Sequence, residues 1–238
     1  MSELSNILLL TLLAGLAMPV GAAFAGVERI RPLWLENELR HSIIAFGGGA
    51  LLSAVALVLV PEGTEGLSIV VASGCFIVGG VSFMAIDVLL AKSQTSASQL
   101  TAMLSDFLPE SIALGAAFAI GGNGAMLLVV LIALQNLPEG FNAYRELKQS
   151  THYSGLKIIA LFTLMAFLGP LAAAVGYLWL VELPSVVNGI MLFAAGGILY
   201  SVFQDIAPQA KLERHWSPAL GAVLGFTLGM VGFMLSHH

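Results

Sequence analysis

Long apolar segments follow one another along almost the whole chain, with little sequence between them. Each is close to the roughly 20 helical residues that cross a hydrocarbon core of about 30 Å. The sequence therefore predicts an all-α, polytopic membrane protein, with residues 1–238 forming a single transmembrane domain. The eight predicted spans are 4–27, 41–60, 66–90, 97–121, 125–144, 158–181, 184–207 and 216–236.

The composition agrees with this interpretation. Hydrophobic residues make up 58% of the chain and charged residues only 10%, whereas soluble domains are about one quarter charged. The single cysteine, Cys75, excludes a disulfide framework or a cysteine-rich metal site. We find no nucleotide-binding motif and no room for an ATPase domain, so any transport would use a gradient. We expect the chain to interact with the lipid bilayer and not with nucleic acid.

The basic residues mark one side of the predicted bundle. All nine lysines and arginines fall in alternate loops, and the opposite loops carry Glu62, Glu65 and Glu182 instead. The positive-inside rule then places both termini outside the cytoplasm of a multi-pass cell (inner) membrane protein. The nine are Arg29, Arg31, Arg40, Lys92, Arg145, Lys148, Lys157, Lys211 and Arg214.

Two neighbouring spans repeat one polar pattern. The fourth contains Ser-Asp-Phe-Leu-Pro-Glu-Ser and the fifth Leu-Gln-Asn-Leu-Pro-Glu-Gly. In each, two polar residues are four apart, so Asp106 with Glu110, and Gln135 with Glu139, share a helical face. Asn142 continues the second stripe. The pattern predicts a polar cluster between the fourth and fifth spans.

These carboxylates lie deep in the predicted membrane. A rise of about 1.5 Å per residue from the turn near Gly122 puts Glu110 at roughly 18 Å and Glu139 at roughly 25 Å, so we expect them to face each other. A charged carboxylate in hydrocarbon costs several kcal/mol unless it is paired. Asp87 and Asp205 lie near the inner ends of spans three and seven, and no predicted span contains a lysine or arginine. A divalent cation among several oxygen ligands would supply the missing charge.

Two other interpretations stay open. The carboxylates can remain protonated and form a structural hydrogen-bonded cluster, because a low dielectric favours the neutral form. They can also relay protons. The repetition of the pattern on adjacent helices favours a shared metal-binding centre.

These features resemble the ZIP (Zrt/Irt-like) metal transporters over essentially the whole chain. The family carries His-Asn-x-Pro-Glu-Gly on its fourth helix and a related Pro-Glu motif on its fifth. The resemblance implies a ZIP-like helical bundle with an inverted repeat and a pathway for divalent metal. Weaker matches to the family lie at residues 60–62, 79–80, 169–171, 176–178 and 195–197.

The resemblance also implies a set of metal-binding residues. By position, Asp106 takes the place of the family's histidine on the fourth helix, and Glu110 that of its glutamate. On the fifth helix, Gln135, Asn136 and Glu139 fit the family's pattern. The implied site therefore consists of these five residues and water.

Besides Asp106, two further positions depart from the family. Phe107 replaces a ligating asparagine, and Gly169 stands where many members carry a glutamate. We therefore expect one main metal rather than a bridged pair. The expected pathway residues are Met84, Asp87, Asn142, Gln204 and Asp205.

The resemblance implies a transporter, not an enzyme, that moves zinc, iron or manganese toward the cytoplasm, with cadmium as a possible mimic. An all-oxygen site favours the harder ions. The alternatives are a membrane-embedded metal-dependent hydrolase and a transport-inactive metal sensor. Gly221, Gly225 and Gly229, spaced by four, predict either close helix packing within the bundle or a homodimer face.

Overall fold

The computed structural model describes residues 3–27, 33–93, 96–119, 125–180, 182–212 and 215–236. All the regular secondary structure in these ranges is helical, which confirms the predicted all-α fold. Within these described residues, seven helical segments are long and apolar enough to cross a membrane. The chain is thus a multi-pass membrane protein. The remaining long helix is α5 (Ser96–Ala119), which carries one copy of the repeated polar pattern.

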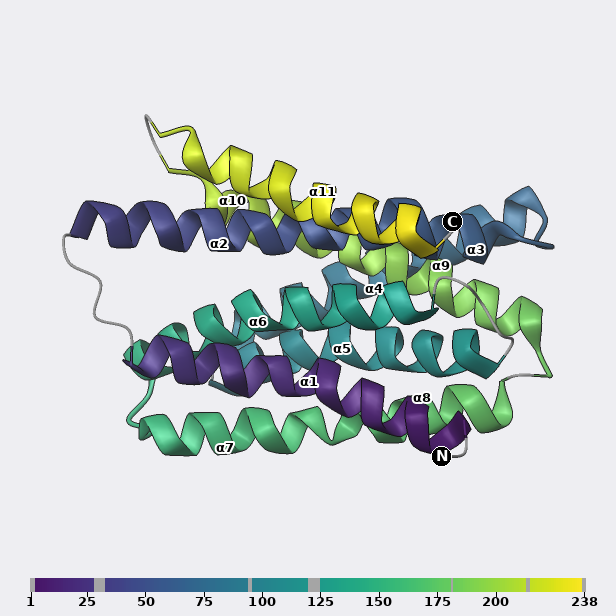
Figure 1. Cartoon of the computed structure of the whole chain (residues 1–238), viewed down its shortest axis with the longest axis horizontal. Coiled ribbons are helices and arrows are strands. Elements are labelled where there is room, and N and C mark those ends of the chain that lie inside the picture. Colours follow the sequence, from purple (N-terminus) through teal and green to yellow (C-terminus); the bar gives the residue numbers. More distant parts are fainter. Residues whose placement is uncertain are drawn as a thin grey trace.

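The long helices lie roughly alongside one another, joined by short connections (Figure 1). Their axes follow the longest dimension of the molecule, as expected of a membrane-spanning bundle. In chain order the elements are α1 (Glu3–Val27), α2 (Leu33–Ala54), η1 (Val55–Leu59), α3 (Val60–Thr64), α4 (Ile69–Ser93), α5 (Ser96–Ala119), α6 (Ala125–Ser150), α7 (Gly155–Ala166), α8 (Leu168–Trp179), α9 (Pro184–Ser201), η2 (Val202–Ile206), α10 (Ala207–Ala210) and α11 (Ser217–Ser236).

Prolines explain where the helices depart from the predicted spans. The π-helical segments η1 and η2 each end just before a helix that has proline in its first turn, Pro61 or Pro208. Proline lacks the backbone N–H and crowds the carbonyl four residues earlier, so the local hydrogen bonding changes. The predicted sixth span is divided at Phe167 into α7 and α8, next to Pro170.

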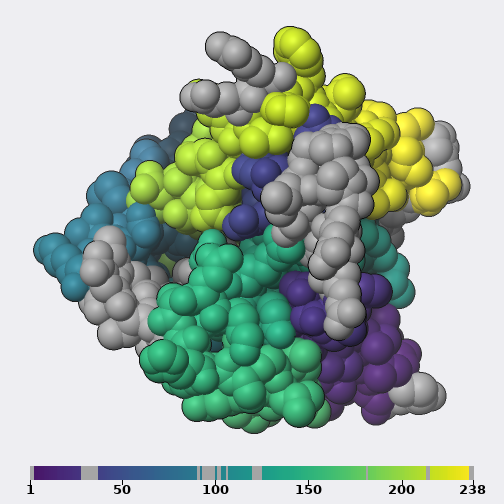
Figure 2. Space-filling view, turned by 90° about the vertical axis from the view of Figure 1, so that its left-hand side faces the viewer, coloured from purple at the N-terminus to yellow at the C-terminus, as the bar shows by residue number. Residues whose placement is uncertain are grey.

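The helices form two groups. The first helix group comprises α1, α5, α6, α7 and α8, in which α1 packs most closely on α6, and α5 on α8. The second helix group comprises α2, η1, α3, α4, α9, η2, α10 and α11, in which α2 packs on α11, and α4 on α9. The groups meet mainly where α2 contacts α6 and α5 contacts α9. In Figure 1, α2 and α11 of the second group lie above α1 and α7 of the first, whereas α4 is seen behind α5 and α6. Figure 2 shows the bundle end-on.

The glycines spaced by four on α11 pack inside the chain. A Cβ atom added to Gly221 would lie 2.4 Å from the carbonyl oxygen of Ser42, and one added to Gly225 would lie 2.0 Å from that of Phe46. At Gly229, the nearest atom is the side-chain Oγ of Ser53, which is also on α2. Helix α11 therefore lies backbone to backbone on α2, which confirms the predicted packing role. A homodimer stays a prediction.

This close approach gives a stability prediction. We expect Gly225→Ala to lower the free energy of unfolding by about 1–3 kcal/mol, because the added methyl group forces α11 away from α2. Gly74→Ala is the matched control: no atom lies within 4 Å of a Cβ at Gly74, so this change should be neutral or stabilise the helix by up to about 1 kcal/mol. Unfolding in detergent, followed by circular dichroism, measures both. Equal effects at the two glycines would contradict the packing.

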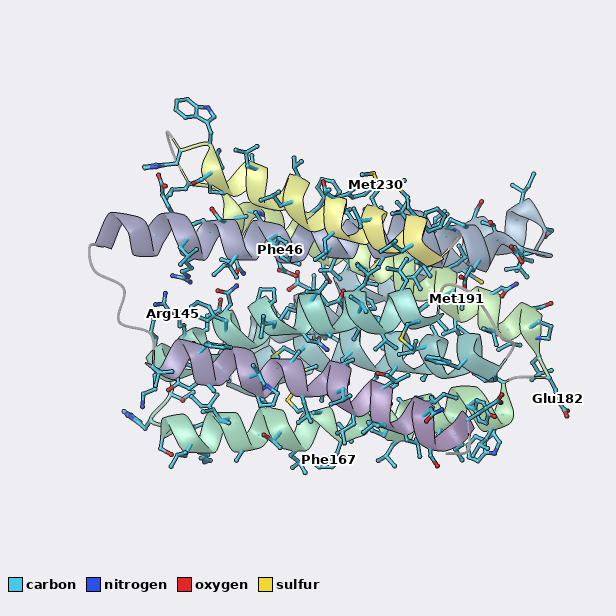
Figure 3. The ribbon with its side chains drawn as sticks, in the orientation of Figure 1. Phe46, Arg145, Phe167, Glu182, Met191 and Met230 are labelled. Carbon is cyan, nitrogen blue, oxygen red and sulfur yellow. The ribbon has the colours of Figure 1, made fainter. Side chains whose placement is uncertain are left out.

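The two ends of the bundle differ in charge. Figure 3 shows Arg145 at the end where α2 begins, and Glu182 at the opposite end. Lys148 and Lys157 flank the connection from α6 to α7 and lie at the same end as Arg145. We call these the Arg145 end and the Glu182 end.

Candidate metal centre

A carboxylate and an amide meet in the interior of the first helix group. Glu110 of α5 and Gln135 of α6 are each only 1% exposed. Nε2 of Gln135 donates a hydrogen bond of 2.5 Å to Oε2 of Glu110. The structure thus brings together one residue from each of the two repeated polar segments.

Helix geometry explains this pairing. Glu110 stands nine residues before the end of α5 at Ala119, and Gln135 stands ten residues after the start of α6 at Ala125. In two neighbouring helices joined by a short turn, these positions lie at the same level. Glu139, which we expected opposite Glu110, lies one turn further along α6, about 6 Å away along the axis, and is half-buried.

The amide oxygen of Gln135, Oε1, is buried and is left without a hydrogen-bond partner in the part of the chain that the structure describes. Buried polar atoms nearly always have such a partner. An amide oxygen beside a carboxylate is a suitable pair of ligands for a divalent cation.

Asn136 ties the site to the neighbouring helix. It is 1% exposed, and its Nδ2 donates a hydrogen bond of 3.0 Å to the backbone carbonyl oxygen of Ala14 in α1. This bond adds to the close packing of α1 on α6, where a Cβ added to Gly140 would lie 2.1 Å from the carbonyl oxygen of Met18. Asn136 therefore holds the α6 segment that carries Gln135 against α1.

This tie gives a second stability prediction. We expect Asn136→Ala to lower the free energy of unfolding by about 0.6–1.5 kcal/mol, because the Ala14 carbonyl loses its donor away from water. The matched control is Asn188→Ala, which removes the exposed hydrogen bond of 2.6 Å from Asn188 to the carbonyl oxygen of Glu65. At this exposed site the change should stay within about 0.5 kcal/mol. Denaturant titration compares the variants, and a larger loss at Asn188 would contradict the assignment.

Asp106 lies on α5 one turn before Glu110. Its side chain is outside the described part of the structure, so its predicted ligand role stays a prediction. Among the described residues, no three His, Cys, Asp or Glu side chains lie close enough to hold a metal ion together. A metal at Glu110 would therefore depend on the amide oxygen of Gln135 as well as on acidic side chains.

Two of the departures from the ZIP pattern, Phe107 and Gly169, touch each other. The Phe107 ring is buried, with 1% exposure. A Cβ added to Gly169 would lie 2.5 Å from the ring atom Cζ of Phe107, and one added to Gly15 would lie 2.8 Å from the same atom. The ring thus occupies the space that any side chain at position 169 would need.

A second acidic group lies nearer the Arg145 end. The hydroxyl of Tyr200 in α9 donates a hydrogen bond of 3.0 Å to Oδ2 of Asp87 in α4. Asp205, on η2, is half-buried and interacts electrostatically with Asp87 and with Glu146 of α6. Predicted pathway residues from two helices of the second group thus lie near one another and near α6.

Sequence reasoning missed Tyr200 and Glu146. The predicted fifth span ended at residue 144, so Glu146 was assigned to a loop, whereas α6 continues to Ser150. The spacing of Tyr200 and Asp205 in the sequence gives no signal that a hydroxyl from α9 reaches a carboxylate on α4.

The other predicted pathway residues differ in exposure. Gln204 is exposed on η2, and Met84 is 44% exposed on α4. Asn142 is half-buried, and its Oδ1 atom is buried with no hydrogen-bond partner within the described ranges. The structure does not bring Met84 into the interior.

The chain is similar to curated zinc transporters from Salmonella. It is 32% identical to "Zinc transporter ZupT" of Salmonella paratyphi A (strain ATCC 9150 / SARB42), of Salmonella newport (strain SL254) and of Salmonella agona (strain SL483). Each match covers 139 residues, which are 58% of this chain and 48% of the relative. The chain thus spans about half the length of these relatives. No family model matches it. These similarities confirm the predicted resemblance to metal transporters over 58% of the chain.

Proposed function

We propose that the chain carries a divalent transition-metal cation, zinc, iron or manganese, across the membrane toward the cytoplasm. The observation that carries the proposal is the buried contact between Glu110 and Gln135. Beside it lies Oε1 of Gln135, which has no hydrogen-bond partner among the described residues. The similarity to proteins named zinc transporters supports the same conclusion.

A cation would change the hydrogen bonding at this centre. In the structure, Gln135 presents its amide nitrogen to Glu110. A metal that binds Glu110 would compete with that nitrogen, and a rotation of the Gln135 amide would present the oxygen instead. Asp106, one turn before Glu110, and Glu139, one turn beyond Gln135, would complete an oxygen-rich set with water and Asn136 nearby. Such a set suits iron(II) and manganese as well as zinc, and cadmium as a mimic.

One metal is the proposed occupancy. The contact between Phe107 and Gly169 leaves no room for a further ligand at position 169, and a phenyl ring supplies none. The proposed site is therefore mononuclear and centred between α5 and α6.

The two helix groups supply a route for alternating access. The proposed ligands all come from α5 and α6 of the first group, whereas Asp87, Tyr200 and Asp205 belong to the second. Rocking of one group against the other, at the α2–α6 and α5–α9 contacts, would bring the metal from the centre to these acidic residues. The basic loops assign the Arg145 end to the cytoplasm, which leaves both termini on the other side.

Metal uptake into proteoliposomes tests the proposed function. The purified protein is reconstituted, and the initial uptake of zinc, manganese, iron(II) and cadmium is compared with that of protein-free vesicles. We expect accumulation of at least one of these ions, down its gradient and without nucleotide. Binding without accumulation would instead indicate a metal sensor, and cleavage of lipid or peptide by the metal-loaded protein would indicate a hydrolase.

A further inference from the structure

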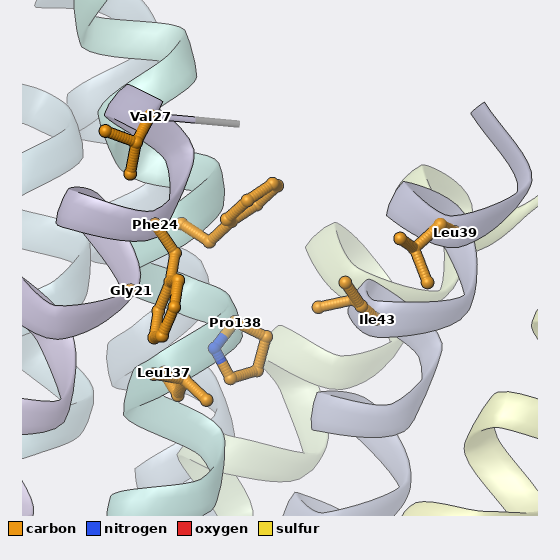
Figure 4. A pocket seen from close by; sticks show the side chains of 8 residues that line it. Gly21, Phe24, Val27, Leu39, Ile43, Leu137 and Pro138 are labelled. Carbon is orange, nitrogen blue, oxygen red and sulfur yellow. The ribbon is translucent and has the colours of Figure 1, made fainter. Parts of the chain in front are cut away.

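An apolar groove of about 430 Å³ lies between the two helix groups. Helices α1 and α6 of the first group form one wall, and α2 of the second group forms the other (Figure 4). All eight residues that line the groove are apolar. They include Phe24 and Val27 of α1, Leu39 and Ile43 of α2, and Leu137 and Phe141 of α6.

The groove is continuous with apolar surface that faces outward from the bundle. The exposed fractions are 60% for Phe24, 76% for Val27 and 41% for Leu39. In membrane-spanning helices such side chains are in contact with lipid. Because an apolar groove does not hold ordered water, its natural occupant in this setting is itself apolar.

A basic residue follows or contacts a groove-lining residue on each wall. The guanidinium carbon of Arg145 on α6 lies 5.1 Å from the centre of the Phe141 ring, which lines the groove. On the other wall, Arg40 follows Leu39 directly on α2. Arg40 also interacts electrostatically with Glu146, which offsets part of the positive charge. Arginine fits the geometry of a phosphate group, and basic residues next to a bilayer favour anionic headgroups.

We propose that this groove binds an anionic phospholipid from the leaflet at the Arg145 end. One acyl chain lies between α1, α6 and α2, and the phosphate lies beside Arg145 and Arg40. Because the lipid contacts both helix groups, it links them at the Arg145 end of their interface.

Titration of the delipidated protein in detergent tests this proposal. Native mass spectrometry counts bound lipids as dioleoylphosphatidylglycerol or dioleoylphosphatidylcholine is added, in the absence of metal. We expect tighter binding of the anionic lipid. Arg145→Gln should weaken that binding by about fivefold, the value of one basic residue at a membrane surface. Lys148→Gln, the control at the same end of α6, should leave it unchanged.

The groove itself is tested by filling it. Leu39→Trp places an indole in the groove and should weaken the binding of both lipids, whereas Val223→Trp, at a 58% exposed position of α11, should not. Ile43→Phe is a smaller second variant if Leu39→Trp fails to fold. Equal lipid affinity in filled and control variants would overturn the proposal. A lipid-free dimer that dissociates on Leu39→Trp would also overturn it, because the groove would then be an interface between copies.

Discussion

Replacing Glu110 by alanine is expected to lower the initial rate of metal uptake into proteoliposomes by about a hundredfold. Even residues that only orient metal ligands change affinity or activity by about 10–100-fold, and Glu110 is the buried carboxylate of the proposed site. Without it, a cation between α5 and α6 would lose the charge that compensates for its dehydration. Initial rates for zinc and manganese, measured at matched protein density, provide the comparison.

Two further variants separate loss of the site from loss of the fold. Glu182→Ala removes an exposed carboxylate at the Glu182 end of the bundle (Figure 3). Metal uptake by this variant should equal uptake by the unmodified protein. Gln135→Leu keeps a side chain of similar size but removes the amide oxygen, and should lower uptake by about tenfold. Unchanged uptake in Glu110→Ala, with the protein correctly inserted, would refute the site. An equal loss in Glu182→Ala would show that the effect is not local.

Gly169→Glu is expected to destabilise the protein strongly, and a second substitution at Phe107 should relieve the effect. The added side chain would meet the Phe107 ring, since a Cβ at 169 already lies 2.5 Å from it. Overpacking of this kind costs about 1–3 kcal/mol. Phe107→Asn alone leaves a cavity, as large-to-small changes of aromatic residues do. It should lower the free energy of unfolding by a comparable amount or more. In the double variant, the shorter side chain makes room for the glutamate.

The double-mutant cycle measures this coupling directly. Residues in contact typically show interaction energies of about 0.5–3 kcal/mol, and we expect a favourable value in this range for Phe107 and Gly169. The metal content should change as well: one metal per chain in the unmodified protein, and two in the Phe107→Asn, Gly169→Glu variant. Additive stability effects would contradict the contact, and two metals in the unmodified protein would contradict the mononuclear site.

Much of the fold follows from the sequence because the length of each apolar segment can be read from neighbouring residues alone. The succession of apolar segments predicts the helices that the structure contains, and the loop glutamates and arginines predict which helix ends lie together. The spacing of four residues between Gln135 and Glu139 also predicts the helix face that they share. Similarly, the glycines of α11 predict a close helix contact.

The remaining features depend on relations between distant segments. The level at which α5 and α6 match places the Gln135 amide within hydrogen-bond distance of Glu110. The sequence of the connection between these helices does not fix that level to within one helical turn. The bond from Tyr200 to Asp87 joins positions 113 residues apart. The contact of Phe107 with Gly169 likewise requires α5 to pack on α8. None of these has a periodic signal in the sequence.

The most direct test of the central claim is a crystal structure of the protein loaded with zinc, with the metal located by anomalous scattering. We expect one zinc ion between α5 and α6, with a carboxylate oxygen of Glu110 and the Oε1 atom of Gln135 about 2.0–2.2 Å from the metal. The hydrogen bond from the Gln135 amide nitrogen to Glu110 would then be broken. Zinc found only at other positions, with that hydrogen bond intact at saturating metal, would contradict the account.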